Sequence, residues 1–126
     1  MVQVWVASRQ RWLVLTPEEE VRRRVVRYLT TRLAVPASLI VEEHLVLLNG
    51  QPQRADIGVF DPSLRPWLVV ECKSPDVPLG QDVLDQVVRY NSVLGASQVV
   101  ITNGLEVEAY SLTSKGTYAP CDFPLP

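Results

Sequence analysis

Three charged residues stand within runs of apolar residues that otherwise suit the interior of a sheet. Asp56 lies in residues 54–60, and Glu71 and Lys73 end the run 67–73. A buried or half-buried charge costs free energy unless it is paired or performs a function. Carboxylate oxygens suit a hard divalent cation, which typically takes one or two carboxylates together with waters and substrate phosphates. These residue types therefore indicate a metal-assisted hydrolytic site with an ammonium group beside it.

The loop between the two runs allows their cross-strand register to be estimated. If Phe60 faces Trp67 across the turn, Asp56 lies directly opposite Glu71. Side chains alternate along a strand, so Glu71 and Lys73 point to the same face. Cross-strand neighbours on one face lie roughly 5 Å apart. The register thus predicts two carboxylates and one ammonium group in a single cluster, and a slip of one residue would destroy it.

The same register places Arg54 opposite Lys73 and allows the backbone carbonyl of Cys72 to act as a further metal ligand. A bound metal would lower the pKa of a coordinated water and offset charge on a phosphoryl transition state. Lys73 would orient that water or stabilise the developing negative charge. The alternative is a salt-bridge patch on one face of the sheet. The combination of Asp56 and Glu71 on paired strands favours the functional interpretation.

The elements around this hairpin predict a mixed α/β domain with one central sheet. Thr16 is a suitable N-cap, Pro17 suits the first helical position, and Glu19 completes a capping box, which predicts a helix from Pro17 to about Leu33. Helical spacing also predicts a helix at 81–94. Strands are predicted at 2–6, 12–15, 39–48, 54–60, 67–73, 98–102 and 106–112. The first two form an N-terminal hairpin, the last is an exposed edge strand that allows a homodimer, and 113–126 is a Pro-rich tail.

Composition limits the classes of protein that remain. A chain of 126 residues suits one domain, covering 1–126. The net charge of −2 is not typical of a nucleic-acid binder, although the first forty residues are basic and the rest are acidic. No apolar run is long enough to span a membrane, and the N-terminus does not read as a signal peptide, which favours the cytoplasm. Cys72 and Cys121 belong to no CxxC or Cys/His cluster, so we expect neither zinc nor a disulfide.

The sequence resembles the PD-(D/E)xK nuclease superfamily. The resemblance rests on RADIGVFD, on VVECKSP, and on Gln86 and Tyr90 in DQVVRYN, which match a QxxxY helix motif found in some branches. Together with TPEEEVRRRVVRYL and VVITNG, these segments look like the N-terminal nuclease domain of type I restriction enzyme R (motor) subunits. The likeness spans about residues 12–112. It implies a restriction-endonuclease-like αβββαβ core with a mixed sheet flanked by helices.

Carried onto this sequence, the resemblance implies that Asp56 and Glu71 bind Mg²⁺, or Mn²⁺, and that Lys73 assists hydrolysis. Gln86 and Tyr90 would orient the catalytic region or contact DNA. Their i, i+4 spacing puts both on one helix face. The alternatives are a solvated polar face for Gln86 and core packing for Tyr90.

Members of the superfamily often carry a carboxylate on the first helix near the metal. The resemblance therefore adds Glu19, with Glu18 as the alternative, to the predicted metal ligands. Arg22, Arg54 and Arg89, together with Gln86, are predicted to contact DNA. For the arginines of the first helix, a solvated helix face is the alternative.

The function that these inferences support is a Mg²⁺-dependent endodeoxyribonuclease. A non-catalytic nucleic-acid-binding or assembly module that retains the nuclease fold is the alternative, and an enzyme acting on another phosphate ester is a third option. The sequence contains no GxxxxGK[ST] loop, so we expect no ATP-driven motor within these residues. The expected partners are DNA and separately encoded restriction or motor subunits.

Overall fold

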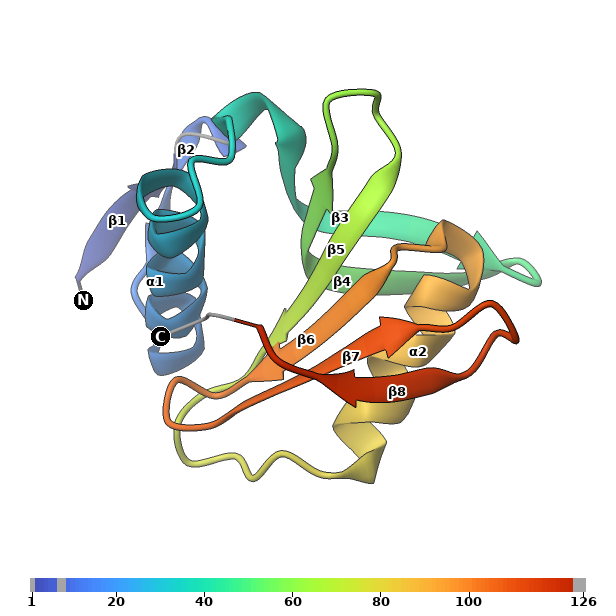
Figure 1. Ribbon diagram of the computed structural model, residues 1–126. Coiled ribbons are helices and arrows are strands. Elements are labelled where there is room, and N and C mark those ends of the chain that lie inside the picture. The colour runs from blue at the N-terminus through green and yellow to red at the C-terminus, as the bar shows by residue number, and fades with distance from the viewer. Residues whose placement is uncertain (1, 7–8, 124–126) are drawn as a thin grey trace.

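The computed structural model describes residues 2–6 and 9–123 and shows a sheet between two helices (Figure 1). The central sheet contains β3 (Ile40–Leu48), β4 (Gln51–Phe60), β5 (Pro66–Cys72), β6 (Gln98–Thr102), β7 (Val107–Leu112) and β8 (Tyr118–Cys121). The helices are α1 (Pro17–Thr31), α2 (Gln81–Leu94) and a short 3₁₀ turn, η2 (Ala37–Leu39). The predicted N-terminal hairpin is confirmed as β1 (Gln3–Val6) and β2 (Arg11–Val14), although part of its turn, residues 7–8, lies outside the described residues.

The six strands form one mixed sheet in the order β3–β4–β5–β6–β7–β8. All neighbours are antiparallel except β5 and β6, which run parallel because the crossover through α2 connects them. This arrangement confirms the predicted core of helix, three strands, helix and strand. The hairpin turn between β3 and β4 is formed by Asn49 and Gly50, both with positive φ, as the Asn-Gly pair indicates.

The two helices cover opposite faces of the sheet. Alternate residues of β5 show this division, since Leu68, Val70 and Cys72 pack in the core beneath α1, whereas Val69 packs in the core beneath α2. Glu71 follows Val69 at the strand period of two and therefore points to the α2 side. The helices contribute apolar stripes to these two cores: Val21, Val25 and Leu29 from α1, and Val83, Val87 and Tyr90 from α2.

The predicted register between β4 and β5 is confirmed in the middle of the hairpin and wrong at its end. Ile57 pairs with Val70, as predicted. Phe60 pairs with Pro66 rather than with Trp67, because a bulge follows Val59. Because the bulge shifts only the pair next to the loop, the predicted register holds from Val59 and Leu68 to Ile57 and Val70.

Beyond Ile57 and Val70 the two strands separate. The β4 strand continues along β3, whereas β5 continues along β6 and leads into Lys73, whose backbone N–H donates to the carbonyl of Thr102 at 2.8 Å. The predicted pairing of Arg54 with Lys73 is therefore wrong, because Arg54 pairs within the β3–β4 ladder instead. This divergence opens a fork in the sheet between β4 and β5.

The ends of α1 differ from the predicted ones in two respects. Thr16 is the N-cap, and its hydroxyl accepts the N–H of Glu19 at 3.1 Å. The reciprocal half of the capping box is absent, because the N–H of Thr16 donates to Val14 and Glu19 pairs with arginines instead. The helix ends at Thr31, two residues early, and Ala34 takes a positive φ of 54°.

Neither long helix could span a membrane, since no helix in the described part of the chain combines the necessary length with sufficient apolar character.

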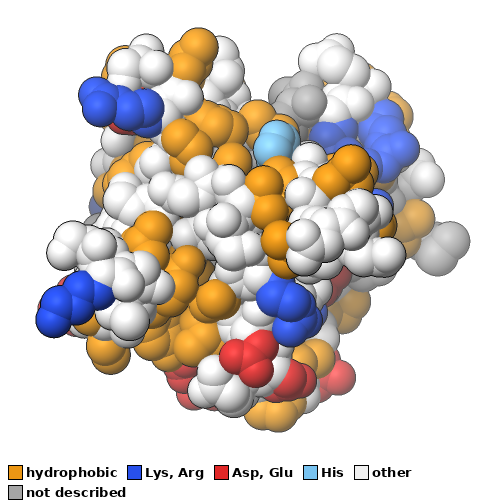
Figure 2. Space-filling view, turned by 90° about the vertical axis from the view of Figure 1, so that its right-hand side faces the viewer, with side chains coloured by type: hydrophobic (Ala, Val, Ile, Leu, Met, Phe, Trp, Pro, Cys, Tyr) orange, Lys and Arg blue, Asp and Glu red, His pale blue; other side chains and the backbone are white. Residues whose placement is uncertain are grey.

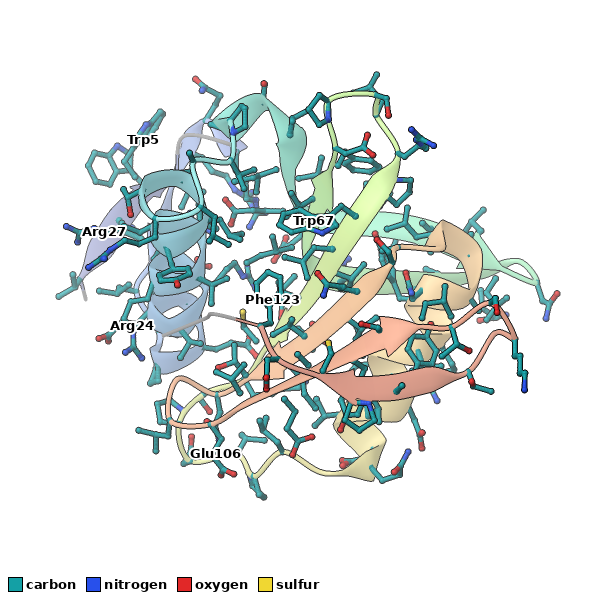
Figure 3. The ribbon with its side chains drawn as sticks, viewed as in Figure 1. Trp5, Arg24, Arg27, Trp67, Glu106 and Phe123 are labelled. Atoms are coloured by element: carbon teal, nitrogen blue, oxygen red, sulfur yellow. The ribbon has the colours of Figure 1, made fainter. Side chains whose placement is uncertain are left out.

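The tail contains structure that its composition did not indicate. Residues Tyr118–Cys121 form β8, which pairs with β7 despite Pro120, and Phe123 then packs against Trp67 with ring centroids 5.9 Å apart (Figure 3). Because β8 covers β7, the exposed edge expected at 106–112 is wrong. With β8 paired along it, β7 offers no free edge for a homodimer. Residues 124–126 of the tail lie outside the described residues.

Candidate active site

Asp56 lies at the fork where β4 leaves β5. Its Oδ2 atom accepts the backbone N–H of Cys72 at 2.7 Å, and its Oδ1 atom accepts a hydrogen bond from Nη2 of Arg22 at 2.8 Å. In the neighbouring β3–β4 ladder, Glu42 pairs with Ile57 and His44 with Ala55, and Glu43, between the two pairs, has an unusual positive φ of 52°. These contacts hold the carboxylate in the gap between the diverging strands.

Glu71 lies beside Asp56, although the β4–β5 ladder ends one pair before them, at Ile57 and Val70, and only 4% of its surface is exposed. Burial, and then contact with the Asp56 carboxylate, raises the pKa of Glu71 to about 9. Two carboxylates this close repel each other unless one carries a proton or a cation lies between them. The pair therefore prefers a proton at neutral pH when no cation is bound.

Lys73 is half-buried just beyond the end of β5 and belongs to the same cluster. Its charge acts to lower the pKa of Glu71, which burial and Asp56 raise more strongly. Its Nζ atom donates a hydrogen bond to Oε1 of Gln86 on α2 at 3.4 Å. The structure thus brings together Asp56, Glu71, Lys73 and Gln86, four of the residues predicted from the sequence.

Arg22 is an internal counter-ion to the cluster and is only 5% exposed. Besides its bond to Asp56, its guanidinium contacts Glu19 and Glu43, each at 3.3 Å. Burial acts to lower the pKa of Arg22, but the surrounding carboxylates together have a larger opposite effect, so the pKa is raised overall. The predicted contact between Arg22 and DNA phosphate does not fit this placement, because the side chain is enclosed. Nothing in the sequence pattern indicated the pairing with Glu43.

The two candidate carboxylates of the first helix, Glu18 and Glu19, have different surroundings. Glu19 is buried and its carboxylate is shared between Arg22 and Arg23. Glu18 is half-buried, and burial followed by the nearby Asp56 charge raises its pKa. The geometry therefore favours Glu18 as the first-helix carboxylate closer to the cluster, the alternative to Glu19 that the sequence left open.

Tyr90 is fully buried, which agrees with the core packing given as the alternative for it. Its ring packs in the core beneath α2, and its hydroxyl lies 2.6 Å from Nδ1 of His44 on β3. Burial raises the pKa of Tyr90 to about 12. The hydrogen bond with His44 ties α2 to the β3–β4 hairpin behind the site. The sequence pattern gave no role to His44, since a single His on a strand has many uses.

The remaining predicted DNA contacts lie on the surface next to the cluster. Arg54 comes from β4 and Arg89 from α2, both exposed, and together with Gln86 they line one cavity. Figure 2 shows that the Lys and Arg side chains on the face viewed there are scattered in separate groups, while acidic side chains gather at its lower end. That face therefore carries no continuous basic surface.

The donor set fits a hard divalent ion better than a softer one. Among the described residues, no group of three or more His, Cys, Asp and Glu side chains is placed to hold a metal. Asp56 and Glu71 supply two adjacent carboxylates, which is the number that Mg²⁺ usually takes from a protein, with waters completing its shell. A cation between them would remove the repulsion that raises the pKa of Glu71. The thiol of Cys72 packs in the core beneath α1, so we consider only the backbone of this residue as a metal ligand.

Comparison with known proteins places this site in a family. No curated protein matches the chain. A family model described as type I restriction enzyme R protein N terminus matches residues 17–123. The match includes both helices, all six strands of the central sheet, and every residue of the cluster. The chain therefore belongs to the family of type I restriction enzyme R protein N-terminal domains.

Proposed function

We propose that this domain is a Mg²⁺-dependent endodeoxyribonuclease, with Mn²⁺ as an alternative ion. The observation that carries the proposal is the contact between the buried Glu71 carboxyl and Asp56, next to Lys73. Such an arrangement is costly for stability, because both carboxylates repel each other in a site of low dielectric. The cost would be explained if the two carboxylates held a divalent cation that binds a substrate phosphate.

Each side chain then has a role in phosphodiester hydrolysis. Asp56 and Glu71 would hold the ion, with the backbone carbonyl of Cys72 as a further ligand and Glu18 on the side of α1. A bound Mg²⁺ supplies an acidified water and offsets negative charge on the phosphate. Lys73, oriented by Gln86, stabilises the negative charge that develops on the phosphoryl oxygens.

The family also supports the partners of the proposed reaction. We propose DNA as the substrate and separately encoded restriction subunits as protein partners, acting in the cytoplasm. Membership of the R protein N-terminal family supports these assignments. The sequence contains no GxxxxGK[ST] loop, so any motor action would come from outside these residues.

The test is cleavage of supercoiled plasmid and of labelled single-stranded DNA in Mg²⁺, in Mn²⁺ and in a chelator. Nicked and linear plasmid would identify endonuclease action. The informative variants are Glu71→Gln and Lys73→Met, which change the charge while preserving much of the shape. We expect each to lower the cleavage rate by about 10²- to 10⁴-fold. The control is Arg65→Gln, since the Arg65 side chain is 81% exposed in the turn at the opposite end of β5.

One observation favours a catalytically silent binding or assembly module as the second candidate. Nη2 of Arg22 donates a hydrogen bond to Oδ1 of Asp56 at 2.8 Å, and the guanidinium neutralises part of the negative charge that would attract a metal. Under this alternative, the wild-type protein would bind DNA without cleaving it in any metal. Cleavage that persists at the wild-type rate in both Glu71→Gln and Lys73→Met would rule out the proposed site.

A further inference from the structure

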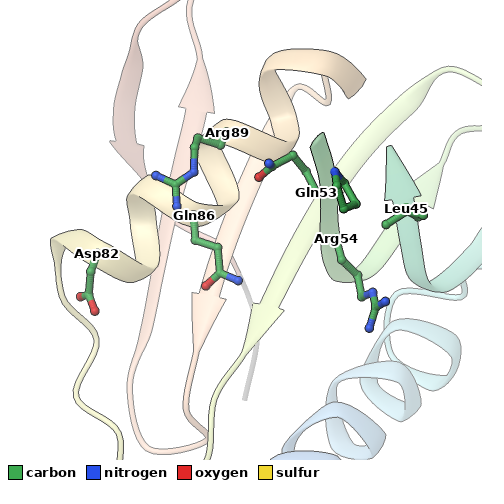
Figure 4. Close-up of a pocket in the computed structure, with 7 residues that line it drawn as sticks. Leu45, Gln53, Arg54, Asp82, Gln86 and Arg89 are labelled. Carbon is green, nitrogen blue, oxygen red and sulfur yellow. The ribbon is translucent and has the colours of Figure 1, made fainter. Parts of the chain in front are cut away.

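A cavity of about 520 Å³ opens beside the catalytic cluster (Figure 4). One wall is the β3–β4 hairpin, which contributes Gln53 and Arg54, and the other is the first half of α2, which contributes Asp82, Gln86 and Arg89. We call this cavity the hairpin–helix groove. Its volume lies within the range of roughly 300–1,000 Å³ that is typical of sites for small organic ligands. It is therefore large enough for a short segment of a polymer rather than for an isolated ion.

The groove is connected to the catalytic cluster through one side chain. Gln86 lines the groove, and its Oε1 atom accepts the hydrogen bond from Nζ of Lys73. A strand whose phosphate lies at Lys73 would therefore continue past Gln86 into the groove.

The two arginines of the groove differ from those of the interior. Arg22 and Arg23 are paired with carboxylates, whereas Arg54 and Arg89 are exposed and form no ion pair with any described residue. They come from opposite walls of the groove (Figure 4). A guanidinium group offers several N–H donors in a geometry that matches a phosphate. Two guanidinium groups without an ion-pair partner among the described residues, on residues that line one cavity, indicate a ligand with negative charges along its length.

The remaining lining indicates how that ligand is recognised. The described lining residues include no aromatic ring, so the groove offers no platform on which bases could stack. It offers instead guanidinium and amide groups, which bind phosphate and sugar oxygens equally well whatever the base sequence. Asp82, in the first turn of α2, is the one carboxylate on the lining and opposes an anionic ligand.

We propose that the hairpin–helix groove binds the sugar–phosphate backbone of the DNA strand next to the scissile phosphate, through Arg54 and Arg89 and without reading its bases. The identity of the ligand as DNA rests on the proposed nuclease function. The binding step itself needs neither the metal nor cleavage, so it can be tested separately.

The test measures the anisotropy of labelled DNA duplexes and single strands of several sequences, in a chelator, over a series of salt concentrations. Arg54→Gln and Arg89→Gln should each weaken binding by about 5-fold, uniformly across sequences, and should reduce the slope of log K against log salt by about 0.7 to 0.9. Asp82→Asn should tighten binding, because it removes a repulsive charge. Arg65→Gln is the matched control, since the seven residues of β5 separate it by roughly 26 Å from Lys73.

Several outcomes would contradict the proposal that the hairpin–helix groove binds DNA. These are an unchanged affinity and salt slope in both arginine variants, the absence of wild-type binding at low salt, an effect that depends on base sequence, or a clear preference for RNA. The two proposals fail separately. If the wild type cleaves plasmid but the arginine variants bind and cleave as it does, only the proposal of DNA binding in the groove is wrong. If the arginine substitutions weaken binding but the wild type never cleaves, DNA binding in the groove is supported and the nuclease function is wrong.

Discussion

The Asp56 carboxylate accepts the backbone N–H of Cys72 at 2.7 Å and so joins two strands that have stopped pairing with each other. In a regular ladder that N–H would meet a carbonyl of β4. Here a side chain takes the place of the carbonyl, and the carboxylate is fixed on the strand that carries Glu71. The site is therefore built by the divergence of the strands rather than by their pairing.

The titration of Glu71 should make the metal-free protein less stable as pH rises. Its pKa is about 9 in the folded chain, above the ordinary value of 4.5, so the folded state binds the proton more tightly. The contribution of Glu71 is fully present below pH 4.5 and is lost as pH rises toward 9, by at most about 1.4 kcal/mol per pH unit. Urea unfolding in a chelator measures this slope. Glu71→Gln should lack this part of the pH dependence, and an equal slope in both proteins would contradict the assignment.

Binding of Mg²⁺ or Mn²⁺ should release a proton at neutral pH. The ion needs the ionised form of Glu71, which carries a proton when no cation is present. Calorimetry in buffers of different ionisation enthalpy measures the proton release directly, and the affinity should rise with pH up to about 9. In Glu71→Gln both the proton release and most of the affinity should disappear. An affinity for Mn²⁺ that is independent of pH would refute the protonated pair.

Replacement of Arg22 should be among the most destabilising changes in α1. Arg22→Met leaves Asp56, Glu19 and Glu43 without their shared counter-ion, and breaking a buried pair in this way costs about 3 to 5 kcal/mol. Urea unfolding measures the loss. Arg27→Met is the matched control, because Arg27 projects from the outer side of the same helix (Figure 3), and we expect a change within about 0.5 kcal/mol. Similar losses in both variants would show that the buried network contributes little.

The hydrogen bond between Tyr90 and His44 should contribute measurably to stability. Tyr90→Phe keeps the buried ring and leaves Nδ1 of His44 without the hydroxyl, at a cost of about 1 to 2 kcal/mol. A double-mutant cycle with His44→Leu isolates the interaction. Tyr110→Phe, whose hydroxyl meets Glu108 nearer the surface, is the control with a smaller expected effect. If Tyr90→Phe costs as much in the His44→Leu background, the bond is not the cause.

The proximity of Asp56 to Glu71 and Lys73 could be predicted because the register up to Ile57 and Val70, one pair away, depends on local rules. Strand alternation and hairpin register are set by neighbouring residues, and the bulge after Val59 corrected the assumed pair at the loop. The separation of the strands could not be predicted in the same way. It depends on how the far end of the β3–β4 hairpin packs against α2, which is a contact between distant segments.

The placement of Arg22 and of β8 was missed for a similar reason. Helical periodicity leaves Arg22 next to apolar positions of α1, but only the docking of α1 against β4 brings it to Asp56. Tyr118–Cys121 is a short strand that contains Pro120, and it forms because β7 offers an edge to pair with. Interactions of this kind belong to the assembled fold rather than to either segment.

The different burial of the two thiols allows local opening of β5 to be measured by chemical labelling. Cys72 is fully buried, and burial raises the pKa of its thiol, whereas Cys121 is half-buried near the end of the described chain. Because alkylating reagents attack the thiolate, Cys72 reacts only when β5 lifts away from α1. In a Cys121→Ser background, the rate of its labelling under native conditions would report how often the strand that carries Glu71 opens.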